Sequence, residues 1–385
     1  MTSEQIHKGL DGVVIDESEL SRVFGDEGRL VFRGYDIDEI AENGDFEETL
    51  YLMWYGELPT ESEYSAFASS LAEQRTVPDE IMEMLADLAA ADQHPMGALQ
   101  AAVAALAGYD DNVEVDPEND LDGVVEMGQS IAAKLATITA AYNRLREGKE
   151  PVEPREDLSH AANFLYMLHG EEPDQAHVEA MDTALQIHME HGTNASTFTT
   201  RVIASTLANP YEAVAGGIGA LSGPLHGGAN EDVLNMLGEI DESGADVGDW
   251  IDSRLDEGGV VYGYGHRVYN VKDPRAYILQ EHAETLIGED GGDDKWYKLA
   301  REVESHMDSL GLEEKGIAPN VDFFSGTVYK QMQIPTDIYT NLFTMSRIGG
   351  WIGHIIEQYE DNRIIRPRAR YVGDVDNDWT PLDAR

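Results

Sequence analysis

Apolar residues recur at intervals of three and four over long runs of this chain. In segment 128–148 they form one stripe, made of Ile131, Leu135, Ile138, Tyr142 and Leu145. This interval is the period of an amphipathic α-helix, which buries one face. Segments 79–91 and 97–109 show the same period. We therefore expect an all-α, mostly helical protein.

Strand-forming patterns are few. The stretch 13–34, "VVIDESELSRVFGDEGRLVFRG", predicts a small sheet or hairpin. The acidic segment 110–123 has the composition of an exposed loop. A chain of 385 residues is long enough for a buried core divided between two lobes.

The charge balance excludes several classes of partner. The chain has 74 acidic and 26 basic residues, a formal net charge of −48, with an ordinary apolar content of 42%. Such a surface repels nucleic acid and anionic membranes. Self-repulsion destabilises the compact state, and molar salt screens it over about 3 Å. We expect a halophilic protein of a salt-rich cytoplasm.

The chemistry of cysteine is also excluded. The chain has no cysteine, so it forms no disulfide, thiolate nucleophile or cysteine-ligated zinc site. Its first residues contain no apolar run of signal length, and no stretch approaches 20 apolar residues. We therefore expect a cytoplasmic protein.

Four histidines stand in unusual surroundings. His226 lies in "GPLHGGAN" and His266 in "GYGHRVYN", each after a glycine-rich turn, while His188 and His191 lie three apart in "IHMEHGTN". Glycine allows close approach of a ligand to the backbone, and an imidazole there can donate to a developing oxyanion. The same pattern also occurs where a histidine caps a tight turn.

A carboxylate and several arginines complete the set. Asp322 lies in the apolar run "NVDFF", where it must be either paired or functional. Burial there raises a carboxyl pKa and suits it to act as a base. Arginines beside glycine or proline favour carboxylate recognition, although a salt bridge is the simpler alternative. They are Arg275, Arg347, Arg366, Arg368 and Arg370.

Together these motifs resemble the citrate synthase family. "HGTNASTFTTR", "GPLHGGAN", "GYGHRVYNVKDPRA" and "PNVDFFSG" occur in this order, and "RPRARYVG" follows near the end. The resemblance covers almost the whole chain and is closest to the compact archaeal and bacterial form. It implies a large helical domain, residues 1–225 and 331–385, which forms a homodimer. A smaller helical domain, residues 226–330, would lie on the coenzyme A side of an interdomain cleft that holds the active site.

The resemblance implies an acyltransferase of the tricarboxylic acid cycle. It would condense oxaloacetate with acetyl-CoA and then hydrolyse citryl-CoA to citrate and coenzyme A. By motif position, Asp322 would remove a proton from the methyl group of acetyl-CoA. His226 would stabilise the resulting enol or enolate, and His266 would polarise the oxaloacetate ketone. Coenzyme A is a substrate here, and neither a tightly bound cofactor nor a metal is implied.

The remaining site residues also follow from the resemblance. His191, Arg275 and Arg347 would hold the oxaloacetate carboxylates, and Arg366 would reach them from the partner subunit. The backbone of one turn would take coenzyme A, namely Val260, Val261, Tyr262, Gly263, Tyr264 and Gly265. Two positions depart from the family, which usually has an acidic residue at Gly192 and Lys or Arg at Asn270. Lys272 and Lys315 are the candidates for the phosphate contact that Asn270 lacks.

Three alternatives stay open on the residues alone. A 2-methylcitrate synthase would use propionyl-CoA, and one methylene gives only about 1–3 kcal/mol of discrimination. A catalytically silent scaffold would keep the fold without the chemistry. A metal hydrolase would bind its ion through histidines and a carboxylate. Its ligands would come from His188, His191, His226 and Asp322.

Overall fold

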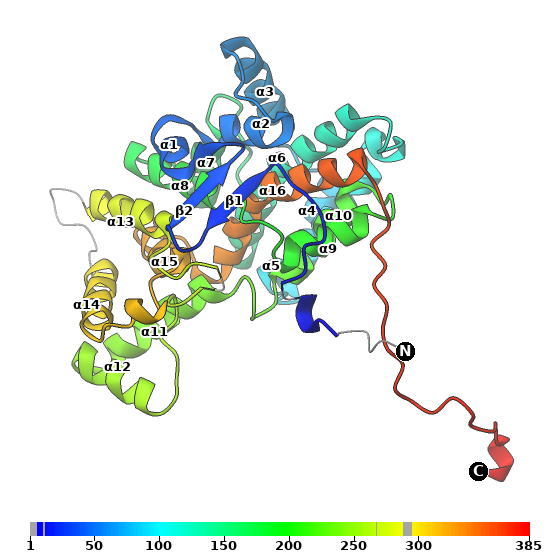
Figure 1. Cartoon of the computed structure of the whole chain (residues 1–385). Helices are drawn as coiled ribbons and strands as arrows, with labels where there is room; N and C mark the ends of the chain where they lie inside the picture. The colour runs from blue at the N-terminus through cyan, green and yellow to red at the C-terminus, as the bar shows by residue number, and fades with distance from the viewer. Residues whose placement is uncertain (1–5, 11, 267, 288–294) are drawn as a thin grey trace.

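A computed structural model of the chain describes residues 6–10, 12–266, 268–287 and 295–385. The expectation of a mostly helical protein is confirmed, since these residues form sixteen α-helices and three short strands (Figure 1). The first eight helices are α1 (Ile37–Asn43), α2 (Phe46–Tyr55), α3 (Glu61–Glu73), α4 (Asp79–Ala90), α5 (Pro95–Leu106), α6 (Leu121–Arg146), α7 (His160–His169) and α8 (Gln175–Ile187). The others are α9 (Ala195–Ala204), α10 (Pro210–Leu221), α11 (Ala229–Ser243), α12 (Val247–Asp256), α13 (Pro274–Ile287), α14 (Lys295–Ser309), α15 (Val321–Gln331) and α16 (Tyr339–Glu360).

The two longest helices, α6 and α16, pack against each other in the core. Both are buried around most of their circumference, as expected for helices that are apolar on more than one face. A Cβ on Gly128 would lie 2.9 Å from Ile352 Cγ2, so this glycine allows the two axes to approach closely. Helix α6 begins earlier than its apolar stripe predicts, because Asp120 caps it by accepting from the Gly123 N–H at 3.0 Å.

Helices α11 to α15 lie together at one end of the molecule (Figure 1). Helix α15 packs on α11, α13 and α14, and α12 packs on α14. Helix α13 also contacts α1 and α8, and α11 contacts α16. These contacts attach the group to the helices around α16.

The predicted hairpin is confirmed near the start of the chain. Strands β1 (Ser21–Phe24), β2 (Arg29–Phe32) and β3 (Tyr35–Asp36) form an antiparallel sheet in that order. The Glu19 N–H donates to Glu357 of α16 at 2.8 Å, which fixes the segment before the hairpin to the core.

The chain after α16 extends away from the helices (Figure 1). Its apolar side chains are largely exposed, Tyr371 at 71%, Val372 at 89% and Trp379 at 85%. Exposed apolar side chains on an extended arm are typical of a surface that another chain covers. None of the described helices is both long and apolar enough to traverse a bilayer.

Candidate active site

Two distant segments pair beside the N-terminus of α15. The Gly265 N–H donates to the Ala318 carbonyl at 2.9 Å, and the Asn320 N–H donates to the Gly263 carbonyl at 2.8 Å. The Asn320 side chain adds a bond to the Gly265 carbonyl at 3.1 Å. This pairing places His266 next to the helix that carries Asp322.

The turn 260–265, predicted to bind coenzyme A, lies at this junction. Val261 and Gly263 are buried, whereas Val260 is exposed. Gly263 has φ 79°, and a Cβ there would lie 2.8 Å from Phe323 Cδ2 and 2.9 Å from Val233 Cγ2. Only glycine meets both the backbone conformation and the space.

Asp322 lies in the first turn of α15, where its N–H is capped by the Asn320 side chain at 3.0 Å. Burial raises the pKa of the Asp322 carboxyl to about 6, against the opposing effect of nearby Arg275. Asp273 also raises this pKa and Arg347 lowers it. The carboxyl therefore lies within electrostatic reach of both predicted substrate arginines. It is ionised at neutral pH and poised to take up a proton.

The two arginines are buried and held by different partners. Arg275 Nε and Nη2 donate to the Asp273 carboxylate at 3.0 and 2.7 Å. Arg347 Nε donates to the His188 carbonyl at 2.9 Å, and its guanidinium lies 4.7 Å from the Phe343 ring centroid. Burial lowers the pKa of Arg347 to about 10, so it remains a cation. Buried guanidinium groups are strong binders of carboxylates.

His266 is a neutral hydrogen-bond donor. Its Nδ1 accepts from the backbone N–H groups of Val268 and Tyr269 at 3.0 and 3.1 Å. These partners assign the ring proton to Nε2. Burial and then Arg275 lower the pKa of His266 to about 4. A neutral Nε2–H is a suitable donor to an oxygen that gains charge.

His191 lies directly against His266. Their ring centroids are 5.1 Å apart in an edge-to-face arrangement, and the Tyr269 ring lies 5.5 Å from His191. Burial, Arg275 and His266 hold the pKa of His191 well below its usual range. The two imidazoles are therefore both neutral and share one face of the site.

His226 lies in the turn between α10 and α11 and reaches the start of α9. Its Nε2 accepts from the Ser196 N–H at 3.2 Å and lies 2.8 Å from Ser196 Oγ. The ring proton is therefore assigned to Nδ1. Asn194 caps the same helix, and its N–H donates to the Gly192 carbonyl at 2.9 Å, next to His191. Helix α9 thus links His226 to the His191 turn.

The other predicted residues lie outside this group. Arg366 is exposed on the extended arm. Lys272 is buried, and its Nζ donates to Glu304 at 2.6 Å and to Gln280 at 2.7 Å. Lys315 is exposed at the end of a short 3₁₀ turn. Lys272 could contact a phosphate only after its ion pair with Glu304 breaks, whereas Lys315 is exposed and could contact one directly.

The two departures from the family pattern have structural partners. Gly192 adopts φ 64°, which turns its N–H onto Glu190 Oε1 at 2.5 Å. A side chain at this conformation is disfavoured, so glycine suits the turn. Asn270 donates to Asp26 Oδ1 at 2.6 Å and its N–H to the Gly25 carbonyl at 3.1 Å. It joins the His266 loop to the turn of the β1–β2 hairpin.

Sequence reasoning missed three residues of the site. Asp273 pairs with Arg275, and its place two residues before Arg275 in "KDPRA" was an available signal. Ser196 follows a capping Asn194 in "TNAST", which is typical of a helix start. Glu190 carried no local signal, because its side-chain partners, Ser21 and His354, come from distant parts of the chain.

The ligand set of the metal-hydrolase alternative is not favoured. Among the described residues, the group whose ligand atoms lie within 4.8 Å of one another is His191, His266 and Asp273. Both oxygens of Asp273 accept from Arg275, and Nδ1 of His266 accepts from two backbone N–H groups. These partners fit a polar substrate site better than a metal centre.

Comparisons with known proteins identify the family of the chain. The family described as citrate synthase, C-terminal domain, matches residues 9–368. Citrate synthase of Haloferax volcanii is 50% identical over 383 residues, covering 100% of both chains. 2-Methylcitrate synthase 1 of Corynebacterium glutamicum is 35% identical over 391 residues and also covers 100% of both.

Solved structures agree as well. Citrate synthase of Pyrobaculum aerophilum superposes with a TM-score of 0.93 at 38% identity, covering 99% of this chain and 95% of that one. Citrate synthase of Thermoplasma acidophilum, in a ternary complex with carboxymethyl coenzyme A and oxaloacetate, gives 0.91 at 33% identity over 100% of both chains. Sequence and structure therefore agree over nearly the whole length, and the chain belongs to the citrate synthase family.

Proposed function

We propose that this protein condenses oxaloacetate with acetyl-CoA and hydrolyses the resulting citryl-CoA to citrate and coenzyme A. The observation that carries the proposal is that these groups lie in one region. Arg275 and Arg347 both lower the pKa of Asp322, and the rings of His191 and His266 lie against each other in the same region. A base, neutral donors and two cations are the groups that this reaction needs.

The residues divide the chemistry as follows. Ionised Asp322 takes a proton from the methyl carbon of acetyl-CoA, and the carbon–hydrogen electron pair forms the enol or enolate. The Nδ1–H of His226 donates to the thioester oxygen, which gains charge in this step. The nucleophilic carbon of the enol or enolate then attacks the ketone carbon of oxaloacetate, and the ketone oxygen gains the electron pair of the broken C=O π bond. This oxygen accepts the Nε2 proton of His266 and becomes the hydroxyl. Water finally cleaves the citryl thioester and releases coenzyme A.

The arginines account for the choice of a dicarboxylate. Arg275 and Arg347 are both largely buried, at 2% exposure, and each places a cation in the region of Asp322. Asp273 occupies Nε and Nη2 of Arg275, so Nη1 of Arg275 and the outer nitrogens of Arg347 are the donors proposed for the two substrate carboxylates. His191, neutral and close to His266, adds a hydrogen-bonding group for the same ligand.

The division into two domains is part of the proposal. Residues 226–330 form the smaller, coenzyme A side and the rest forms the larger side, with the substrates between them. Asp322 and His266 belong to the first, and His191 and Arg347 to the second. The packing of α11 to α15 on one another supports this division.

The protein is further proposed to act as a homodimer in which Arg366 serves the partner's site. Arg366 lies on the extended arm, whose exposed Tyr371, Val372 and Trp379 are suited to burial against a second copy. For coenzyme A, exposed Lys315 is the favoured phosphate contact over Lys272, which is bound by Glu304. The net charge of −48 supports a salt-rich cytoplasm as its setting.

The test is a coenzyme A release assay with oxaloacetate and either acetyl-CoA or propionyl-CoA. It is run in roughly 2 M KCl, where the Debye length is below about 3 Å. We expect a higher kcat/KM for acetyl-CoA, in keeping with the higher identity to a citrate synthase than to a 2-methylcitrate synthase. A preference for propionyl-CoA would assign the alternative, and no release with either would reject the proposal.

A further inference from the structure

The segment that carries His191 is fixed to one face of α16. Three successive residues of the segment each bond to α16, at positions about one turn apart along the helix. The bonds join Arg347 Nε to the His188 carbonyl (2.9 Å), the Gly350 N–H to the Met189 carbonyl (3.2 Å), and His354 Nε2 to Glu190 Oε1 (3.1 Å). A Cβ at Gly350 would lie 2.5 Å from the Met189 oxygen, so the two segments are as close as glycine allows.

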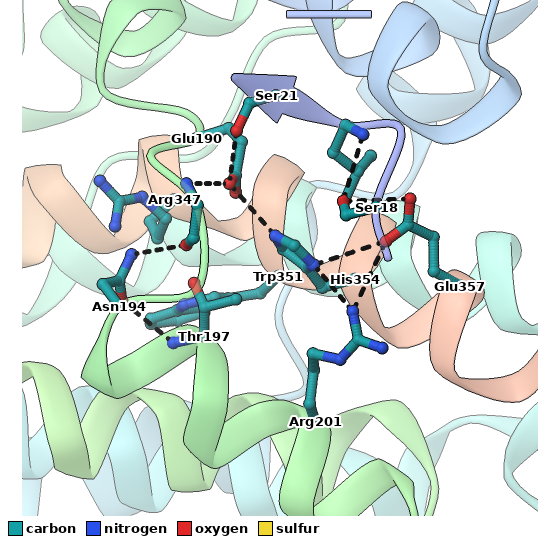
Figure 2. A network of polar contacts seen from close by, with 12 residues as sticks. Ser18, Ser21, Glu190, Asn194, Thr197, Arg201, Arg347, Trp351, His354 and Glu357 are labelled. Carbon is teal, nitrogen blue, oxygen red and sulfur yellow. Dashed lines mark hydrogen bonds and ion pairs between the residues drawn. The ribbon is translucent and has the colours of Figure 1, made fainter. Parts of the chain in front are cut away.

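Glu190 is the anionic member of this contact (Figure 2). It is fully buried, and its Oε1 accepts from Ser21 Oγ at 3.1 Å, the Gly192 N–H at 2.5 Å and His354 Nε2 at 3.1 Å. Burial raises the pKa of Glu190, but His354 and Arg347 more than offset this and hold it below its usual range. A buried carboxylate is therefore present behind the cation that is proposed to bind oxaloacetate.

His354 is oriented by a second arginine (Figure 2). Its Nδ1 lies 3.3 Å from Arg201 Nη1, and a guanidinium can only donate. Nδ1 also lies 3.6 Å from Glu357 Oε2. The Arg201 contact is a hydrogen bond when Nδ1 accepts, and in that tautomer the Nε2 proton is directed to Glu190. Arg201 is held in turn by Asp16, which is partly exposed, and by Gln358. A continuous series of contacts thus runs from the surface to the His191 turn.

We propose that Glu190 is a positioning residue for oxaloacetate, kept in place by His354 and Ser21. This inference rests on the proposed function. Its carboxylate competes with the substrate carboxylate for Arg347, because both are anions near one cation. The three donors bind Oε1 and keep Glu190 from closing on Arg347, while the bond to Gly192 fixes the turn after His191. The outer nitrogens of Arg347 then remain directed to the substrate.

The test compares variants of the two donor side chains with a matched control. His354→Ala removes the imidazole donor, and Ser21→Ala removes only a hydroxyl. Ser243→Ala is the control, since it removes a serine hydroxyl that donates to the Ile240 carbonyl at the end of α11 instead of to Glu190. His354→Gln restores an N–H donor and serves as the conservative rescue.

We expect His354→Ala to raise KM for oxaloacetate roughly tenfold or more, the size of a lost hydrogen bond to a charged group. Ser21→Ala gives a smaller rise in the same direction, His354→Gln recovers most of the loss, and KM for acetyl-CoA stays near wild type throughout. Because ligand binding stabilises the native state, the rise in Tm caused by oxaloacetate alone shrinks in the same order.

Two results would overturn this role. One is an equal effect of Ser243→Ala and Ser21→Ala on KM for oxaloacetate. The other is a lower Tm in His354→Ala with KM and the oxaloacetate-dependent rise in Tm both unchanged, as for a purely structural residue. The failure of the proposed function is a separate outcome, since it would appear as a wild-type protein that releases no coenzyme A.

Discussion

The imidazoles of His191 and His266 lie edge to face with ring centroids 5.1 Å apart, although they come from opposite sides of the site. His191 is attached to α16 through the segment 188–192, whereas His266 is attached to α15 through the pairing of 263–265 with 318–320. The distance between the two rings therefore reports the relative position of α16 and α15. The same junction contains Asp322, for which the first predictions are made.

Asp322→Asn is expected to lower kcat about 100-fold or more, because an amide cannot accept the methyl proton. Coenzyme A release with saturating substrates measures this. Asp249→Asn is the control, since it removes an exposed aspartate from the first turn of α12, as Asp322→Asn does from the first turn of α15. Turnover near wild type in the Asp322 variant would contradict its assignment as the base.

The same substitution is expected to stabilise the fold at pH 8. The folded-state pKa of Asp322 is raised to about 6, above its usual 3.8, so the unfolded chain ionises first as pH rises. The free energy of unfolding therefore falls as pH rises from about 4 to about 6, by roughly 1.4 kcal/mol per pH unit. Asn does not ionise, so the variant does not lose this free energy of unfolding. Its Tm should therefore exceed that of wild type at pH 8 and be close to it at pH 4. Equal differences at both pH values would argue against the raised pKa.

Turnover is expected to fall as pH drops through about 6. Below the pKa of Asp322 in the free protein the base is protonated, and kcat/KM should fall about tenfold per pH unit. His266 has a pKa lowered to about 4 and stays neutral over this range. A pH profile of kcat/KM from about 5 to about 8, at constant molar KCl, tests the expectation. A flat profile would exclude a titrating base of this pKa.

Mixed dimers test whether Arg366 acts across the interface. Arg366→Gln and Asp322→Asn chains are each nearly inactive alone, but a mixed dimer holds one site with both residues intact. Random pairing should restore about a quarter of wild-type turnover, since about half of the dimers are mixed and each has one working site. Chains unfolded and refolded separately before mixing provide the control. Recovery of no activity in refolded mixtures would place Arg366 in its own protomer's site.

Salt is expected to raise the Tm strongly. The net charge of −48 repels itself at low ionic strength, and about 1 M KCl screens this repulsion over about 3 Å. Thermal melts in roughly 0.1 M and roughly 2 M KCl provide the measurement, since they lie on either side of that screening range. Identical melts would show that the acidic surface is not what limits stability.

Local sequence patterns predicted the helices and strands better than they predicted the tertiary contacts between them. The hairpin of β1 and β2 and the helices over 79–90 and 95–106 follow from periodicity and turn residues. The start of α6 did not, because Gly123 and Gly128 are typical of a boundary, while Gly128 serves the close approach to Ile352 inside the helix. That requirement arises only once α16 is in place.

The same limit applies to the site. Motifs located His226, His266 and Asp322, because glycine turns and an acid in an apolar run are visible locally. The pairing of Lys272 with Glu304, and that of Glu190 with His354, depend on tertiary contacts between distant segments. The roles of all these residues remain predictions for the experiments above.

Three bonds to α16 also limit which side of the molecule can move. Because α16 is enclosed by α2, α6, α8, α9 and α10, displacing the His191 segment would disturb much of the interior. We therefore expect the His191 segment to keep its place when substrate binds, and any adjustment to be made by the loop of His266 and the start of α15. On this expectation, a redesign for a different acyl group should tolerate substitutions in the loop of His266 and at the start of α15 better than in the segment 188–192.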